Sequence, residues 1–315
     1  MNMNFFQQPL VLTSGFTLPS RAILSPLEGI MNRENFFRAA VGLKLIDSWM
    51  PPFIGITKDA SPKAGALRKR YRLFLDSGIP FTAQILGHDP GAMGEACHTI
   101  SGLGVRSVNV NCACPSPTVI GSGSGAALLR QPDLLKRILL SIRAAAPEIC
   151  LSVKLRSGFH TPDELPDILA AIKEGGARWV IHHYRTAEEM YAPLSQTEAI
   201  RRFRTVRTHL PDTVFFANGD ITTPEDAEKI RQECACDGIA VGRGILRNPF
   251  LLRSIVTGAE TTDDLRAEFL RLLTGNIARH RRHFQLECVK MAYGEESPEF
   301  QAALRSVQHR ESPPG

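Results

Sequence analysis

Cys112 and Cys114 are separated by one residue, follow a short apolar run and precede a proline. A Cys-x-Cys pair is a weak zinc signal, because structural zinc sites usually combine a Cys-x₂-Cys pair with two further ligands. Cys234 and Cys236 lie at the end of a distant predicted helix, so we expect no metal site. Taken alone, the pair is explained most simply by two small buried side chains.

Other side chains that can bind ligands or move protons stand at or just after the ends of apolar runs. They are Glu28, Gln84, Asn111, Lys154, His183, Asn218 and Arg243. Packing explains Lys154 poorly, because a buried ammonium group without a partner is costly. A closed barrel gathers such strand ends around one mouth, whereas a doubly wound sheet spreads them along an edge. The pattern therefore favours the barrel.

Short apolar runs alternate with amphipathic segments, which predicts a βαβ series and a parallel sheet. Eight strands are expected, at residues 21–25, 45–49, 81–85, 107–111, 151–156, 179–183, 214–217 and 238–241. Helices are predicted at residues 132–145, 163–174, 198–209 and 224–232, and after the last strand at 261–284 and 298–308. The predicted fold is an α/β protein: a (β/α)₈ TIM barrel over residues 1–255 with a small C-terminal helical domain over residues 256–315.

The composition excludes several classes of protein. The chain has 315 residues, 43% of them hydrophobic, and a net charge of +5, which is ordinary for a globular protein and permits a polyanionic partner without requiring one. No apolar run is long enough to cross a membrane, and the N-terminal residues lack the basic and apolar regions of a secretory signal. Seven cysteines without a regular spacing indicate reduced thiols. The expectation is a cytoplasmic monomer that does not contact membranes.

The segment from Asn109 to Leu129 resembles the Asn-x-Gly-Cys-Pro-Ser signature of the tRNA-dihydrouridine synthase family, and is closest to its C branch. Six further segments are similar to family motifs and follow in the family's order. They are Ser25-Pro-Leu-Glu-Gly29, Gln84-Ile-Leu-Gly87, Ser152-Val-Lys-Leu-Arg156, Ile181-His-His-Tyr-Arg-Thr186, Ala217-Asn-Gly-Asp220 and Val241-Gly-Arg-Gly244. Because these segments fall on predicted strand ends over nearly the whole barrel, chance agreement does not explain the resemblance.

The resemblance implies that FMN reduces uridine in tRNA to 5,6-dihydrouridine, with NADPH as the electron donor. Reduction of the C5=C6 bond of uracil needs a hydride at C6 and a proton at C5. The family's proton donor corresponds to Cys114, which leaves Cys112 as a packing residue. The implied uridine contacts are Asn111 and Arg156. The implied FMN-binding residues are Pro26, Leu27, Glu28, Gln84, Lys154, His183, Asn218, Gly219, Asp220, Gly242 and Arg243.

Within that set, Lys154 would stabilise negative charge on the flavin ring, and the last two strand ends would hold the flavin phosphate. His183 aligns with the family histidine, so strand alternation should turn His182 to the opposite face of the sheet.

Three basic clusters, at residues 68–72, 201–207 and 279–283, could contact an RNA backbone. A solvated helix face is the alternative for each of them. We expect Arg279, Arg281 and Arg282 to contact phosphates, because they lie on about one helical turn.

The chain departs from the family pattern where the substrate nucleotide is expected, whereas the flavin positions are retained. Asn109 replaces an acid, Ala113 a glycine, Pro117 a lysine, Tyr184 a glycine, and Pro51-Pro52 a Thr-Glu pair. Two alternatives therefore stay open. One is a flavin reductase that acts on a small unsaturated molecule, and the other is a flavin-binding homologue that binds RNA or protein without reductase activity.

Overall fold

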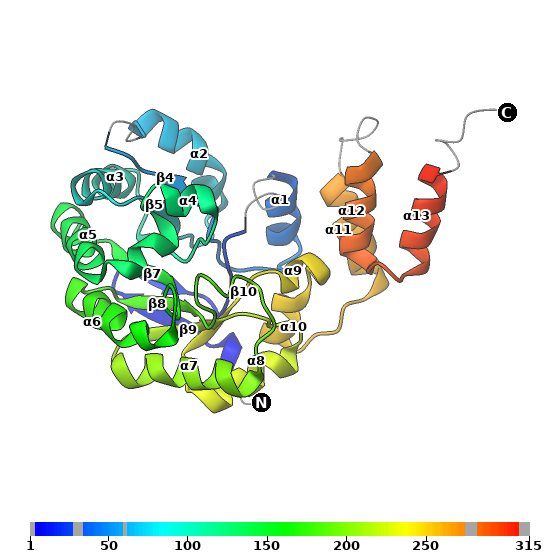
Figure 1. Cartoon of the computed structure of the whole chain (residues 1–315). Helices are drawn as coiled ribbons and strands as arrows, with labels where there is room; N and C mark the ends of the chain where they lie inside the picture. The colour runs from blue at the N-terminus through cyan, green and yellow to red at the C-terminus, as the bar shows by residue number, and fades with distance from the viewer. Residues whose placement is uncertain (1–3, 28–33, 59–61, 275–281, 309–315) are drawn as a thin grey trace.

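Side chains alternate along each strand between the inside of the molecule and the outer face, which the helices cover. On β7 (Cys150–Arg156), Ser152 and Lys154 point inward, whereas the aliphatic Leu151, Val153 and Leu155 are buried on the outer face, beneath the helices. The computed structural model describes residues 4–27, 34–58, 62–274 and 282–308 of the chain. Within them, eight parallel strands curl around a common axis with helices outside (Figure 1).

The strand order is that of a barrel. The remaining parallel strands are β3 (Ala22–Leu24), β4 (Ile54–Gly55), β5 (Ala83–Leu86), β6 (Ser107–Cys112), β8 (Trp179–His183), β9 (Val214–Asn218) and β10 (Gly238–Val241). The ladder runs from β3 through β10 to β4, with no pairing between β3 and β4 in the described residues. Each strand pairs with its sequence neighbour from β4 to β10, and β10 pairs in parallel with β3, the first strand of the series. The first and last strands are thus adjacent, which confirms the expected (β/α)₈ TIM barrel.

Most of the helices that follow cover the outside of the barrel. The helices are α1 (Glu34–Gly42), α2 (Ala64–Ser77), α3 (Pro90–Gly102), α4 (Pro117–Gly121), α5 (Pro132–Ala145), α6 (Leu165–Gly175), α7 (Gln196–His209), α8 (Pro224–Cys234), α9 (Gly244–Arg247) and α10 (Leu251–Thr257). Of these, α4 lies on the loop after β6. At the start of α8, Thr223 and Asp226 form a capping box, and Pro224 occupies the first turn between them. No helix in the described ranges is long and apolar enough to cross a membrane.

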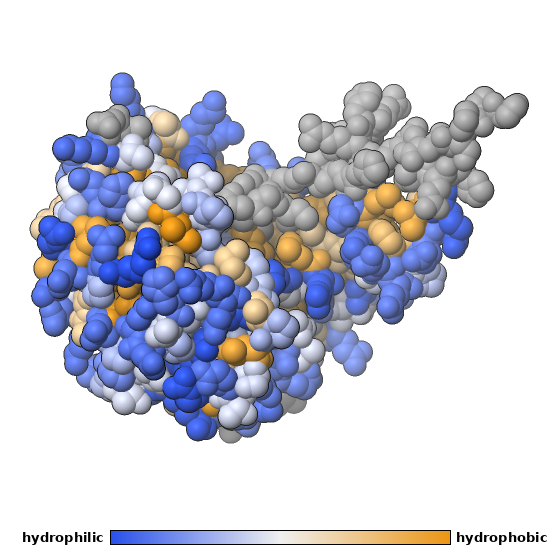
Figure 2. Space-filling view, in the orientation of Figure 1, coloured by the Kyte–Doolittle hydropathy of each residue, from blue (hydrophilic) through white to orange (hydrophobic). Residues whose placement is uncertain are grey.

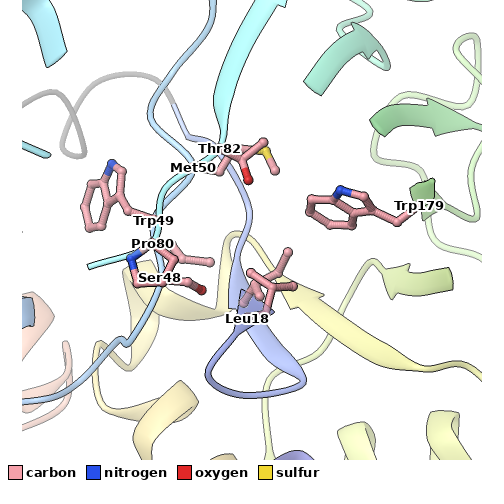
Figure 3. A pocket seen from close by; sticks show the side chains of 9 residues that line it. Leu18, Ser48, Trp49, Met50, Pro80, Thr82 and Trp179 are labelled. Atoms are coloured by element: carbon pink, nitrogen blue, oxygen red, sulfur yellow. The ribbon is translucent and has the colours of Figure 1, made fainter. Parts of the chain in front are cut away.

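An antiparallel hairpin closes the end of the barrel where the strands begin. Its strands are β1 (Leu10–Thr13) and β2 (Phe16–Leu18), and Phe16 and Leu18 pack with the inward side chains of Trp179 and Phe216. The cavity left beside this plug has a volume of only about 10 Å³, between Leu18, Trp179 and Met50 (Figure 3). Ligands are therefore expected at the opposite end, where the strands terminate.

The second strand differs from its prediction. Residues 45–49 were expected to form it, but only Trp49 bridges to Phe81, and the named strand β4 begins at Ile54. Pro51-Pro52 lies between these two points. Proline has no backbone N–H to donate, so the ladder stops at the prolines and resumes after them against β5.

The C-terminal helices also differ from their prediction. One helix was expected at residues 261–284, but the structure has α11 (Asp263–Thr274) and a separate α12 (Arg282–Tyr293). In the sequence, Gly275-Asn276 follows α11 directly, and both residue types favour a helix end. The third helix of this group, α13 (Pro298–Gln308), has the predicted bounds.

The C-terminal helices attach to the barrel through α1 (Figure 1). Phe269 of α11 is completely buried, and its ring lies 6.2 Å from that of Phe36 and 5.4 Å from that of Phe250. Asn35 adds a hydrogen bond, since its amide donates to the Leu273 carbonyl. The proposed domain boundary after residue 255 falls inside α10, which lies against the barrel.

Replacing Phe269 with alanine should cost about 3–5 kcal/mol of unfolding free energy, because the cavity would remove two aromatic contacts at once. Urea denaturation followed by circular dichroism measures this loss. Val11→Ala is the control, because Val11 is 68% exposed and its truncation should change stability by less than about 0.5 kcal/mol. Equal stabilities for the two variants would contradict the assigned attachment point.

Candidate active site

The polar residues predicted at strand ends meet at one end of the barrel. Asn111 on β6 lies opposite Lys154 on β7, and His183 on β8 lies opposite Asn218 on β9. Arg156, the last residue of β7, is in register with His183. The strand register therefore places four of the predicted site residues, and the arginine beside them, around the same mouth.

A chain of buried amides lies beneath this mouth. The Asn109 amide donates to Ser152 Oγ at 2.8 Å, and Gln84 donates to Asn109 Oδ1 at 2.8 Å. Asn111 in turn donates to Gln84 Oε1 at 3.0 Å. Gln84, Asn109 and Ser152 have no exposed surface, so each amide has one orientation that satisfies its neighbours.

Asn111 connects the amide chain to the loop that holds Cys114. Its Oδ1 accepts the backbone N–H groups of Ala113, at 3.0 Å, and of Cys114, at 2.9 Å. The Cys114 carbonyl accepts the N–H of Ala126 at 3.0 Å, which ties the far side of the loop. The predicted uridine contact Asn111 is thus 6% exposed and positions the predicted acid.

Gly125 is needed for the same loop. Its φ is +61°, and a Cβ atom there would lie 2.9 Å from the Cys114 carbonyl oxygen and 2.6 Å from a methyl group of Val119. Glycine at position 125 therefore lets the chain pack closely behind Cys114.

The two cysteines of the motif have different surroundings. Cys112 is completely buried in the outer core, and burial raises the pKa of its thiol, which confirms the packing role expected for it. Cys114 is half-buried on the loop. All seven cysteines are free thiols, and the described residues contain no group of three metal-ligating side chains.

The surroundings of Lys154 disfavour its charged form. Burial lowers its pKa to about 7, the nearby charge of Arg156 lowers it as well, and the Cys114 sulfur acts in the opposite direction. No carboxylate in the described part of the chain forms an ion pair with it. An unpaired ammonium at a barrel mouth is suited to an anionic ligand.

The two adjacent histidines face opposite sides of the sheet, as strand alternation predicts. His182 packs between the rings of Phe203 and Phe215, and its Nε2 is 2.8 Å from Ser157 Oγ. His183 lies on the inner side and its Nδ1 accepts the N–H of Arg185 at 3.2 Å. Burial, followed by the charges of Arg156 and Lys154, holds the pKa of His183 far below its usual value. His183 is therefore neutral and carries its proton on Nε2.

Arg156 clamps two loops at the mouth. Its Nε donates to the Ala113 carbonyl at 2.8 Å, and its Nη1 donates to the carbonyls of Thr186 and Met190 at 2.8 and 3.0 Å. Burial lowers its pKa to about 10, so the guanidinium stays charged at neutral pH. This side chain, predicted to contact uridine, is 3% exposed and fixes the entrance around Cys114.

The ends of β9 and β10, where the flavin phosphate is predicted to bind, lie next to each other. The Asn218 amide donates to the Ala240 carbonyl at 2.6 Å, and Arg243 donates to Asp220 Oδ1 at 3.0 Å. A Cβ atom on Gly242 would meet nothing closer than Ser25 Cβ at 3.9 Å, so the space above this strand end is open. The side chain of Arg243 is 48% exposed and can also reach an anion.

These features fit FMN. The unpaired Lys154, the neutral N–H donor of His183, and the open strand end with Arg243 match a flavin ring and its phosphate. Pro26 and Leu27 are half-buried just after β3, as predicted for residues that line the ring. Gln84 lies beneath the mouth in the amide chain, and Glu28 is outside the described residues.

The other sequence departures have structural explanations. Asn109 both donates and accepts in the amide chain, which a carboxylate could not do. Pro117 occupies the first turn of α4, a position that needs no backbone N–H. Ala113 is buried beside the clamp of Arg156.

Most arginines of the basic cluster on α7 form ion pairs within the protein. Arg202 is buried and pairs with Glu189 and Glu198, and Arg207 pairs with Asp237. Arg201 and Arg204 line a groove of about 380 Å³ between α7 and α8, on a mostly hydrophilic flank of the barrel (Figure 2). These contacts favour the structural interpretation of this cluster.

The other two basic clusters, at residues 68–72 and 279–283, give less evidence about RNA binding. On α2, Arg70 donates to the carbonyls of Pro52 and Phe53. Arg279, Arg281 and the side chain of Arg282 lie outside the described residues, so their phosphate contacts stay a prediction.

Comparison with known proteins agrees with the geometry. A family model described as dihydrouridine synthase matches residues 62–308. The chain is 33% identical over 267 residues to a tRNA-dihydrouridine(16) synthase of Aquipseudomonas alcaligenes, covering 82% of this chain and 83% of that protein. It is 29% identical over 309 residues to the tRNA-dihydrouridine(16) synthase of Cupriavidus necator, covering 92% of this chain and 94% of that protein.

Solved structures support the fold alone. An old yellow enzyme from Trypanosoma cruzi superposes with a TM-score of 0.58 at 11% identity, covering 84% of this chain and 95% of the other. A variant of NCR from Zymomonas mobilis gives 0.57 at 16% identity, covering 85% and 96%.

Lys154→Met should stabilise the flavin-free protein at neutral pH, and the gain should shrink as the pH rises toward 10. The folded-state pKa of Lys154 is about 7, below that of an unfolded lysine, so above pH 7 the unfolded chain binds more protons and wild-type stability increases. Thermal unfolding of both proteins from pH 6 to 10 measures the difference. Lys154→Arg, which keeps the charge, should give no gain, and a pH-independent difference for Lys154→Met would contradict the assignment.

Proposed function

This chain belongs to the dihydrouridine synthase family, and we propose that it reduces uridine 16 of tRNA to 5,6-dihydrouridine. It is an FMN-dependent oxidoreductase with NADPH as the reductant. One observation carries the proposal. The Cys114 loop, Lys154, His183 and the ends of β9 and β10 lie around the same mouth of the barrel. Position 16 is supported by the names of the relatives, and we infer membership of the C branch from the motifs.

The described residues proposed to hold FMN lie at or beneath that mouth. When bound, FMN supplies the hydride that reduces C6 of uracil. Lys154 would provide positive charge at the ring, and His183 would donate its Nε2–H. Asn218, Gly219, Asp220, Gly242 and Arg243 would hold the phosphate, and Pro26, Leu27, Glu28 and Gln84 complete the proposed set.

Cys114 is proposed as the proton donor to C5 of uracil. Asn111 accepts the backbone N–H groups of Cys114 and of the preceding Ala113, and Arg156 donates to the Ala113 carbonyl, so the thiol sits on a loop with little freedom. A general acid must be held within hydrogen-bond reach of the carbon's reacting face, and this pair of contacts provides that positioning. Asn111 and Arg156 stay the proposed uridine contacts as well.

The helices after residue 255 are proposed as the RNA-binding domain of a monomeric cytoplasmic enzyme. They stand beside the barrel and connect to it through α1, which follows the first strand of the mouth (Figure 1). A folded RNA that reaches the mouth could therefore contact both parts of the chain.

Mass spectrometry of tRNA from a strain that lacks this gene tests the function. Dihydrouridine at position 16 should be absent and should return when the gene is supplied. Unchanged dihydrouridine at every position would overturn the proposal. Loss at another position would retain the reaction and correct the site.

Arg243→Ala should raise the FMN dissociation constant about tenfold to a hundredfold, as expected for losing charged hydrogen bonds to a phosphate. Flavin fluorescence during titration of the flavin-free protein measures this. Arg247→Ala is the control, because Arg247 is exposed one turn later on α9. Equal FMN affinities for the two variants would remove Arg243 from the phosphate site.

Cys114→Ala should lower the rate of dihydrouridine formation by about 10²–10⁴-fold, the usual range for a lost general acid. Flavin content and flavin reduction by NADPH should be unchanged, because neither needs a proton on uracil. Cys112→Ala should instead lower stability with little effect on turnover, since Cys112 is buried in the core. The assignment is wrong if the two variants exchange these properties.

A further inference from the structure

Tyr184 stands directly after β8, where the family pattern has glycine, and its ring is built into the mouth. The side chain is 4% exposed. The ring stacks on His183, with centroids 5.3 Å apart and planes inclined by 20°, and meets Phe203 edge-on at 5.7 Å. The position of the ring is therefore fixed by packing on two sides.

The ring also depends on Gly219, the middle residue of the Asn218–Asp220 turn. A Cβ atom on Gly219 would lie 2.5 Å from Cε1 of Tyr184, and the φ of Gly219 is +130°. Only glycine admits both this conformation and this contact. The tyrosine thus rests against the backbone of the turn proposed to hold the flavin phosphate.

The hydroxyl group of Tyr184 is hydrogen-bonded to Asp220. It donates to Asp220 Oδ2, which also accepts from Arg185, while Oδ1 accepts from Arg243 at 3.0 Å. Burial raises the pKa of Tyr184, as does its hydrogen bond to Asp220, so the hydroxyl stays a donor. Burial opposes ionisation of Asp220, but the hydrogen bonds from Arg185 and Tyr184 hold its pKa below its usual value.

An ionised carboxylate beside a phosphate site would repel the phosphate and compete for the same arginine. Two donors on Oδ2 weaken that competition, because they fix the carboxylate and neutralise part of its charge. One oxygen is then left to orient Arg243, whose half-exposed guanidinium keeps donors for a ligand.

We propose that the Tyr184 hydroxyl is a positioning group for a phosphate monoester, acting through Asp220 on Arg243. The inference rests on the flavin-binding role proposed above for the ends of β9 and β10. It gives the bulky residue at position 184 a function in cofactor retention rather than in contact with the substrate base.

FMN and riboflavin distinguish this role from simple packing, because riboflavin lacks the phosphate. Full-length protein stripped of flavin is titrated with each, and binding is followed by flavin fluorescence. Tyr184→Phe keeps the ring and should raise the dissociation constant of FMN by about five- to thirtyfold, since one hydrogen bond to a charged group is lost. The dissociation constant of riboflavin should change less than about twofold, because the variant leaves the ring site intact.

Tyr191→Phe is the matched control. Its ring lies 4.4 Å from the guanidinium carbon of Arg243, and its hydroxyl makes no hydrogen bond within the described residues. This variant should bind both flavins as the wild type does. In an Asp220→Asn background, Tyr184→Phe should lose most of its effect on FMN, because the two residues act as one unit.

Equal weakening of FMN and riboflavin by Tyr184→Phe would assign the tyrosine to packing and overturn the proposal, as would unchanged FMN affinity. Equal affinity of the wild type for the two flavins would also overturn it, because no phosphate contribution would then exist. Wild-type protein that binds neither flavin would contradict the proposed function itself.

Discussion

The positioning of the candidate acid depends on the buried amide chain that runs from Ser152 through Asn109 and Gln84 to Asn111. Amides differ from hydroxyls in having separate donor and acceptor ends, so one fixed amide orients the next. At the last step, Asn111 presents its oxygen to the backbone of Cys114. The rigidity of a loop at the surface thus originates in the middle of the barrel, where water does not compete.

Charge at the mouth is distributed differently from charge over the whole molecule. The net charge of +5 does not locate a site, and most arginines of α7 are neutralised by carboxylates on the same flank. At the mouth, Lys154 has no such partner among the residues that the structure describes, and Asp220 accepts hydrogen bonds from three donors. The geometry of pairing therefore says more about the ligand than the number of basic residues does.

Sequence reasoning located the strands well wherever an apolar run ended at a polar residue or a glycine. The pattern predicts β8 and β10 at their observed bounds but misplaces β4, because Pro51-Pro52 interrupts the ladder and the strand resumes only at Ile54. Site residues were found by type at strand ends. Their partners were not found, since Tyr184 and Asp220 are 36 residues apart and meet only through the strand register.

The pairing of β3 with β10 has a consequence for the order in which the protein can be completed on the ribosome. Within the described residues, the strand partner of residues 22–24 is residues 238–241, and the Asn4 amide donates to the carbonyl of Ile255. Helix α1 packs against α11, which is synthesised later still. During synthesis β3 must therefore wait, with an open strand edge, until residues 238–241 have been made. Such long-range closure slows folding and makes the nascent chain dependent on protection from aggregation.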